Sequence, residues 1–153
     1  MEDGLTIREK LSYEIYRFLN RDFLAAAMAA CALVAYADKK IKLSERYQID
    51  AILSKDKALS QFDSETATLL LDKDLEDLRQ NGAVATQRLH DRVGKMHGHA
   101  KRSRTLLRVA YLIITADGDI DELEEIEFVN LCVLLGHDAN TVWKELRGER
   151  PSL

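Results

Sequence analysis

The stretch FLAAAMAACALVAYA, residues 23–37, decides the fold class because it contains no charged side chain. Eight of its 15 residues are alanine, a strong helix former that partitions only weakly into lipid. A membrane-spanning helix needs about 20 apolar residues, more than this stretch supplies. We therefore expect a helix that is buried on all sides in the core of a helical protein, and no direct insertion into a membrane.

Helical spacing of apolar residues extends over the rest of the chain. The pattern predicts helices near residues 5–20, 22–37, 44–53, 64–80, 85–96, 101–116, 121–136 and 139–147. One proline and seven glycines in 153 residues are too few for the frequent turns of an all-β fold. The sequence thus predicts a single all-α domain over residues 1–153, a compact bundle of about seven or eight helices.

Charge and cysteine content narrow the function class. The 26 acidic and 22 basic residues give a formal charge of −4, which argues against nucleic acid as a partner. The first ten residues are charged and do not have the pattern of a signal peptide, and two cysteines make no disulfide framework. We expect a cytoplasmic protein with reduced thiols, present as a monomer or a weak homodimer.

The most informative feature is an internal repeat with an offset of 79 residues. The segment ALVAYADKKIKLSERYQIDAI (residues 32–52) aligns with YLIITADGDIDELEEIEFVNL (residues 111–131). Each copy contains an apolar helix, the motif Ala-Asp-x-x-Ile-x-x-x-Glu and a second amphipathic helix. Two repeat units, near residues 23–53 and 102–132, are too few and too far apart for a solenoid, so we expect one domain with pseudo-twofold halves.

Asp38 and Asp117 begin the repeated turn at the point where an apolar helix ends. A helix C-terminus carries about half a negative charge, so a carboxylate there needs compensation. In a structural interpretation, the aspartate accepts backbone N–H bonds or caps the next helix. In the other interpretation, the carboxylate and the helix-end carbonyls are hard oxygen ligands for a divalent cation. The turn pattern alone leaves both interpretations open.

The second copy of the turn is strongly acidic. Asp117, Asp119 and Asp121 alternate, and four glutamates follow in the next six residues without a base. The spacing begins like an EF-hand loop, but its sixth position is Glu and its twelfth is Phe, so it is not an EF-hand. Asp121 and Glu124 fit a capping box. Capping explains Asp117 and Asp119 less well, so these two remain candidate cation ligands.

The first copy of the turn is less acidic. Lys39, Lys40 and Lys42 stand where the second copy has a glycine and two aspartates. If the turns bind cations, the second turn should therefore bind more strongly. In the structural interpretation, Lys39 or Lys40 compensates the charge of Asp38 directly.

A basic segment precedes the acidic turn. Residues 88–108 contain one acid, Asp91, and seven bases: Arg88, Arg92, Lys95, Lys101, Arg102, Arg104 and Arg108. This segment is either a docking face for an acidic partner or a solvated face that balances the acidic turn.

The histidines and cysteines give weaker indications of a functional site. His97 and His99, with His90 seven residues before His97, lack a recognised zinc spacing, which favours a surface loop around His97 and His99 over a zinc site. Cys31 and Cys132 lie within apolar helices, where neutral thiols are inert. No catalytic triad, phosphate-binding loop or CxxC motif is present, so we do not expect an enzyme.

At the repeated turn the sequence resembles the tellurite-resistance protein TerB family. The residues that carry the resemblance are YADKKIKLSE (residues 36–45) and TADGDIDELE (residues 115–124), with an alanine-rich helix before the first. The similarity covers about residues 20–140. The family pattern usually reads Ala-Asp-Gly, and the first copy departs from it at Lys39, which weakens the expectation of metal binding there.

The resemblance implies an all-helical, cytoplasmic, non-catalytic bacterial protein linked to tellurite and other stress resistance. It implies binding of a divalent metal ion of unknown identity through acids of the motif, which correspond to Asp38, Glu45, Asp117 and Glu124. Asp119 joins these candidates as part of the acidic turn. The partners implied are other proteins of a stress-resistance system, and a protein-interaction scaffold in which the acids cap helices is the alternative.

Overall fold

The computed structural model describes residues 6–41, 43–116 and 118–149. Six helices occur in these ranges: α1 (Ile7–Ala35), α2 (Leu43–Lys55), α3 (Ser64–Gly94), α4 (Ala100–Thr115), α5 (Glu122–Leu135) and α6 (Ala139–Glu149). None of the described residues belongs to a strand. Because α3 consists of two segments that meet at Gly82, the described chain has seven helical segments. The predicted all-α bundle is confirmed.

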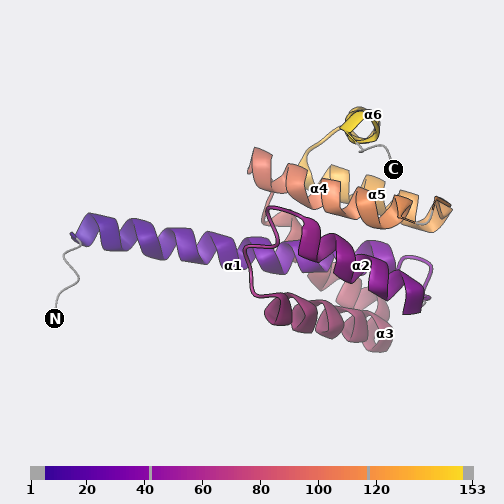
Figure 1. The fold of residues 1–153 in the computed structure, drawn as a ribbon, viewed down its shortest axis with the longest axis horizontal. Coiled ribbons are helices and arrows are strands. Elements are labelled where there is room, and N and C mark those ends of the chain that lie inside the picture. Colours follow the sequence, from indigo (N-terminus) through magenta and orange to yellow (C-terminus); the bar gives the residue numbers. More distant parts are fainter. Residues whose placement is uncertain (1–5, 42, 117, 150–153) are drawn as a thin grey trace.

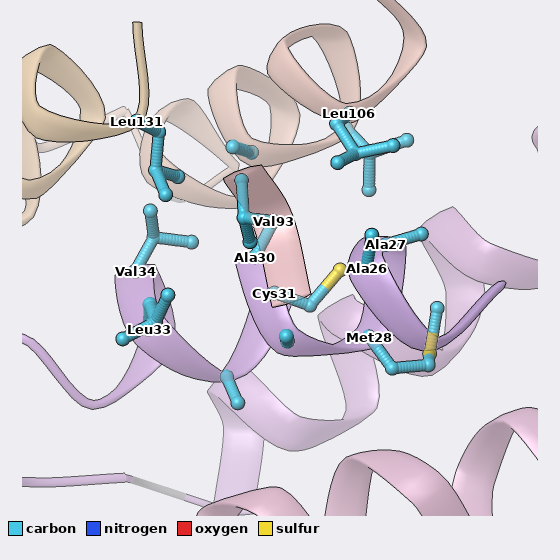
Figure 2. Close-up of a cluster of buried hydrophobic side chains, with 14 of the residues drawn as sticks. Ala26, Ala27, Met28, Ala30, Cys31, Leu33, Val34, Val93, Leu106 and Leu131 are labelled. Atoms are coloured by element: carbon cyan, nitrogen blue, oxygen red, sulfur yellow. The ribbon is translucent and has the colours of Figure 1, made fainter. Parts of the chain in front are cut away.

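The alanine-rich part of α1 is the centre of the bundle. From residue 23 to residue 35, every side chain except that of Ala25 is buried. The helices α3, α4 and α5 pack against α1, and Figure 2 shows Val93, Leu106 and Leu131 from these helices beside its small side chains. Helix axes approach more closely where the side chains at the contact are small. The predicted helix that is buried on all sides is confirmed.

The predicted boundary between the first two helices, near residue 21, is wrong. α1 continues without interruption through Asn20, Arg21 and Asp22, none of which is a glycine or a proline. Thr6 caps the start of this long helix, and its hydroxyl accepts a hydrogen bond from the Glu9 amide at 3.1 Å. In Figure 1 the first half of α1 extends well beyond the other helices.

α3 folds back on itself at Gly82, where φ is 47° and ψ is −119°, a conformation that favours glycine. Asp77 and Arg88 form an ion pair of 2.6 Å, and Asp74 and Arg92 form one of 2.7 Å. A straight helix would separate these pairs by about 16 and 27 Å along its axis. The two segments of α3 therefore lie side by side, and the predicted helix stop at this glycine is confirmed.

The helices α4, α5 and α6 complete the core. Trp143 of α6 packs edge-on against Tyr111 of α4 and Phe128 of α5, with ring centroids 4.9 and 5.2 Å apart. Edge-to-face ring pairs stabilise a core beyond the area that they bury. Among the described residues, no helix combines the length and the apolar character that crossing a membrane requires.

Candidate functional site

The two copies of the repeated turn follow α1 and α4, which pack against each other, and both turns lie at the same end of the bundle in Figure 1. The Lys39 amide donates to the Tyr36 carbonyl at 2.9 Å, and the aligned Gly118 amide donates to the Thr115 carbonyl at 3.2 Å. The alanine of each Ala-Asp pair donates to the carbonyl three residues back, at 3.4 Å in both turns. The turns thus share backbone hydrogen bonds, while the pseudo-twofold relation of the two halves stays a prediction.

The residue after Ala-Asp has a left-handed backbone in both turns. The φ angle is 63° at Lys39 and 84° at Gly118. Glycine adopts this conformation easily, whereas a residue with a Cβ atom is destabilised there by about 1–2 kcal/mol. No heavy atom lies within 4 Å of the Cβ position at Gly118, so backbone conformation rather than crowding favours glycine there.

Asp38 takes part in its own turn. Its Oδ1 atom accepts a hydrogen bond from the Lys40 amide at 3.0 Å, as in an Asx turn. This bond supports the structural interpretation for one carboxylate oxygen. It does not exclude ligation, because a carboxylate offers two oxygens and about four lone pairs. The exposed Lys39 and Lys40 side chains place positive charge on the same turn, which disfavours a cation.

Asp121 is the N-cap of α5, as the sequence predicts. Its Oδ1 atom accepts hydrogen bonds from the amides of Leu123 at 2.8 Å and Glu124 at 3.2 Å. Asp119 is exposed in the turn before this cap, and Glu124 is half-buried in the first turn of α5. Acidic side chains at this end of a helix are stabilised by the helix dipole.

Two of the five candidate metal ligands, Asp117 and the side chain of Glu45, lie outside the part of the chain that the structure describes. Among the side chains that it does describe, no three histidines, cysteines, aspartates or glutamates come together to hold a metal ion. Asp38, Asp119 and Glu124 therefore do not form such a group by themselves. A site that combines them with Asp117 or Glu45 stays a prediction.

A cavity of about 400 Å³ opens beside the first repeated turn. It lies between the end of α1, the kink of α3 and one residue of α5, Glu127. Lys39 and Glu127 give its lining charges of both signs, and Thr86 and Gln87 add polar groups.

Glu127 also forms an ion pair that joins α5 to α3. Its Oε1 atom lies 2.6 Å from Nε2 of His90, and both side chains are largely buried. The hydrogen bond to Glu127 raises the pKa of His90, against the effect of burial, which lowers it. The charges of Glu127 and Asp91 raise it further. Nε2 of His90 is therefore bonded to Glu127, so His90 does not form a group with the other histidines.

The basic segment is balanced largely within the chain. Arg102 donates a hydrogen bond to the Asn20 side chain at 2.8 Å and lies over the Phe23 ring. Four further arginines form ion pairs of 2.6–2.7 Å, which are Arg88–Asp77, Arg92–Asp74, Arg104–Glu145 and Arg108–Asp56. These acids belong to α3, to α6 and to the loop after α2. The positive charges of these four arginines are thus compensated by acids outside the acidic repeated turn.

Two buried aspartates were not predicted from the sequence. Asp56 accepts hydrogen bonds from the Ala58 and Leu59 amides at 2.9 and 3.2 Å and from Arg108 at 2.7 Å. Asp74 pairs with Arg92, and burial raises the pKa of Asp74 although Arg92 lowers it. The arginine partners are 52 and 18 residues away in the sequence, beyond the reach of local patterns.

Two of the remaining histidines, His97 and His137, line one cavity of about 280 Å³, and His99 is not among its lining residues. A Cβ atom at Gly136 would lie 2.8 Å from Nε2 of His97, so His97 packs against that turn. His99 is exposed just before α4. Nε2 of His137 lies 2.8 Å from the Ser103 hydroxyl oxygen. The exposed positions of His97 and His99 support the prediction of a surface loop there.

Cys31 and Cys132 are both buried, as predicted. Burial raises the pKa of each thiol to about 12. Since the thiolate is the reactive form, both cysteines are poor candidates for nucleophilic or redox chemistry.

These features define an all-α domain built around a buried alanine-rich helix, with two Ala-Asp turns at one end of the bundle. Residues 24–143, which include both turns, match the family described as Tellurite resistance protein TerB. The chain therefore belongs to the TerB family, in agreement with the repeated motif. Neither the curated proteins nor the solved structures include a significant match to this chain.

Proposed function

We propose that this TerB domain is a non-catalytic, cytoplasmic binding module of a tellurite- or stress-resistance system, and that its second repeated turn binds a divalent cation. The observation that carries the proposal is the acidic segment of residues 117–127, which comprises the second repeated turn and the start of α5, contains seven acids and no base, and lies inside the segment that matches the family. Six of these seven acids are described, and Asp119 among them is exposed to solvent.

The chemistry of the turn supports a hard cation. Asp117, Asp119 and Glu124 would supply carboxylate oxygens, and the end of α4 would add backbone carbonyl oxygens. Capping of α5 uses only Oδ1 of Asp121, so its second oxygen can take part as well. Ca²⁺, Mg²⁺ and Mn²⁺ prefer oxygen ligands of this kind.

The first turn should bind a cation weakly in comparison. Asp38 and Glu45 are its candidate ligands, but Lys39 and Lys40 add two positive charges where the second turn has Gly118 and Asp119. Positive side chains in the same turn repel a bound cation.

Calorimetric titration of metal-free protein with Ca²⁺, Mg²⁺, Mn²⁺ and Zn²⁺ tests the proposal. We expect binding of micromolar strength or better for at least one ion, and at least about tenfold weaker binding in Asp119→Asn and in Asp117→Asn. Asp138→Asn is the matched control, because Asp138 caps the α6 region through the Thr141 amide at 3.0 Å and lies beyond the far end of α5. Absence of heat and of thermal stabilisation at millimolar metal would exclude the cation site.

A protein-interaction scaffold is the second candidate function. It is favoured by the hydrogen bonds of Asp38 and Asp121, which already give each carboxylate a structural role. In this case Asp121→Ala destabilises the protein with or without metal, and no ion changes the melting temperature. The titration therefore separates the two candidates.

A further inference from the structure

α5 is apolar on two opposite sides. One side packs into the core, and Figure 2 shows Leu131 of α5 beside Val34 of α1. On the other side, four apolar residues are between 42% and 71% exposed and form the α5 stripe: Leu123, Ile126, Val129 and Val133. At about 100° per residue, their spacing keeps them within about a third of the helix circumference, over a length of about 15 Å.

The α5 stripe is unusual for the solvent side of a helix. A helix that packs against a core through one side normally has polar residues on the other side, and a helix that is apolar all round is normally buried. Single exposed apolar residues are common on soluble proteins, whereas contiguous rows of them often mark interaction sites. The described part of the chain leaves all four side chains of the stripe well exposed.

The same side of α5 is acidic. Glu122 lies within the arc of the stripe and Glu125 about 40° outside it, and both residues are exposed. Among the described residues, neither glutamate side chain takes part in an ion pair. Residues 118–135 contain six acids and no base. A molecule that covers the stripe therefore meets negative charge that α5 itself does not compensate.

We propose that the α5 stripe binds an amphipathic helix of another protein, which has apolar residues on the side that faces the stripe and lysine or arginine residues beside them. A helix fits this surface because its own apolar residues, at intervals of three and four positions, form a row that packs between those of α5. About ten residues of the partner helix match the length of the stripe. The bases of the partner pair with Glu122 and Glu125, which favours a basic helix over a neutral or acidic one.

A second copy of this chain does not supply the same complementarity through its own α5. In a parallel pair of α5 helices, the glutamates of the two copies face each other. In an antiparallel pair, they approach the C-terminal half of the other α5, where the helix dipole is negative and the sequence contains no base. An anionic membrane surface likewise repels Glu122 and Glu125.

The inference goes beyond the proposed cation site and is tested separately from it. The candidate metal ligands include no residue of the stripe and neither Glu122 nor Glu125. The binding measurements are made with a chelator present, so that failure of the helix-binding surface and failure of the cation site are distinguishable.

Fluorescence anisotropy of a labelled peptide tests the surface on the full chain. The probe is a peptide of about 14 residues with leucine at intervals of three and four positions, lysine on the adjacent flank and alanine elsewhere. We expect a dissociation constant below about 100 μM at low salt. The same peptide with glutamate in place of lysine should bind at least about tenfold more weakly.

Variants of α5 test the location. Ile126→Gln and Val133→Gln remove apolar side chains of the stripe without adding charge, and each should weaken binding at least about fivefold while the helical circular dichroism is retained. Leu69→Gln is the matched control, because Leu69 is 63% exposed but lies on α3. Glu122→Gln combined with Glu125→Gln should weaken binding at low salt and reduce its dependence on salt.

Several outcomes would overturn the inference. One is no binding of the lysine peptide at submillimolar protein, and another is binding that Ile126→Gln and Val133→Gln leave unchanged. Sedimentation equilibrium may not show a dimer that Ile126→Gln dissociates, since this result would assign the stripe to a second copy. Binding of the protein to phosphatidylcholine vesicles that Val133→Gln abolishes would assign the stripe to a membrane surface instead.

Discussion

Lys39 and Gly118 have the same left-handed backbone conformation in two turns that lie 79 residues apart, with φ angles of 63° and 84°. Each amide donates a hydrogen bond to the carbonyl three residues earlier. The two turns thus share a backbone conformation although their side chains differ. In the first turn a lysine occupies the position at which this conformation favours glycine.

This shared conformation predicts that a substitution at Lys39 and one at Gly118 will change the stability of the protein in opposite directions. Relief of backbone strain in Lys39→Gly is about 1–2 kcal/mol, and the added freedom of the unfolded chain opposes it by about 0.5–1 kcal/mol. We therefore expect the free energy of unfolding to rise by about 0.5–1 kcal/mol in Lys39→Gly and to fall by about 1 kcal/mol in Gly118→Ala. Denaturant unfolding with an unchanged m-value measures both. A loss of stability in Lys39→Gly would contradict the strained turn.

Loss of the ion pair between Asp74 and Arg92 should destabilise the protein far more than loss of the pair between Asp77 and Arg88. Arg92→Ala leaves the buried Asp74 carboxylate without its cation, and we expect a loss of about 2–4 kcal/mol at neutral pH. Because the pKa of Asp74 is already raised by burial, this loss should shrink in mild acid as the carboxyl becomes neutral.

Two variants control for the loss of the arginine itself. Asp74→Asn combined with Arg92→Ala should recover part of the stability, since no buried charge remains. Arg88→Ala, which breaks a more exposed pair on the same helix hairpin, should have a smaller effect. Equal losses in Arg92→Ala and Arg88→Ala, measured by urea unfolding, would show that burial of Asp74 is not decisive.

The His90–Glu127 pair makes stability depend on pH. The pKa of His90 is raised in the folded state above its ordinary value of 6.5, mainly by the hydrogen bond to Glu127. The stabilisation is therefore complete below pH 6.5 and is lost as the pH rises through the raised pKa. We expect the difference in free energy of unfolding between the wild type and Glu127→Gln to be larger at about pH 6 than at about pH 9. Glu125→Gln, an exposed control on α5, should show no such trend.

The native thiols should resist modification. Cys31 and Cys132 are buried, and burial raises the pKa of each to about 12. A maleimide reagent at neutral pH should label neither cysteine in the folded protein and both in denaturant. Rapid labelling of one native thiol would instead support redox chemistry at that residue.

Local features of this protein were predictable from the sequence. The alanine-rich stretch of α1, the Asp121 cap and the helix stop at Gly82 depend on residues within a few positions of one another. The boundary near residue 21 was predicted wrongly because polar residues at the surface of a long helix resemble a helix end. The metal ligands Asp38, Glu45, Asp117, Asp119 and Glu124 stay a prediction.

The sequence by itself determined the helical class, the two Ala-Asp turns and the membership in the TerB family, because periodicity, turn chemistry and motifs are short-range properties. Only the tertiary structure decided which charges meet. Arg108 with Asp56 and His90 with Glu127 are pairs 52 and 37 residues apart, and helix packing alone brings them within 2.7 Å. It also decided that α5 keeps an apolar stripe at the surface, since a helix that is apolar on two sides can bury only one against a single core.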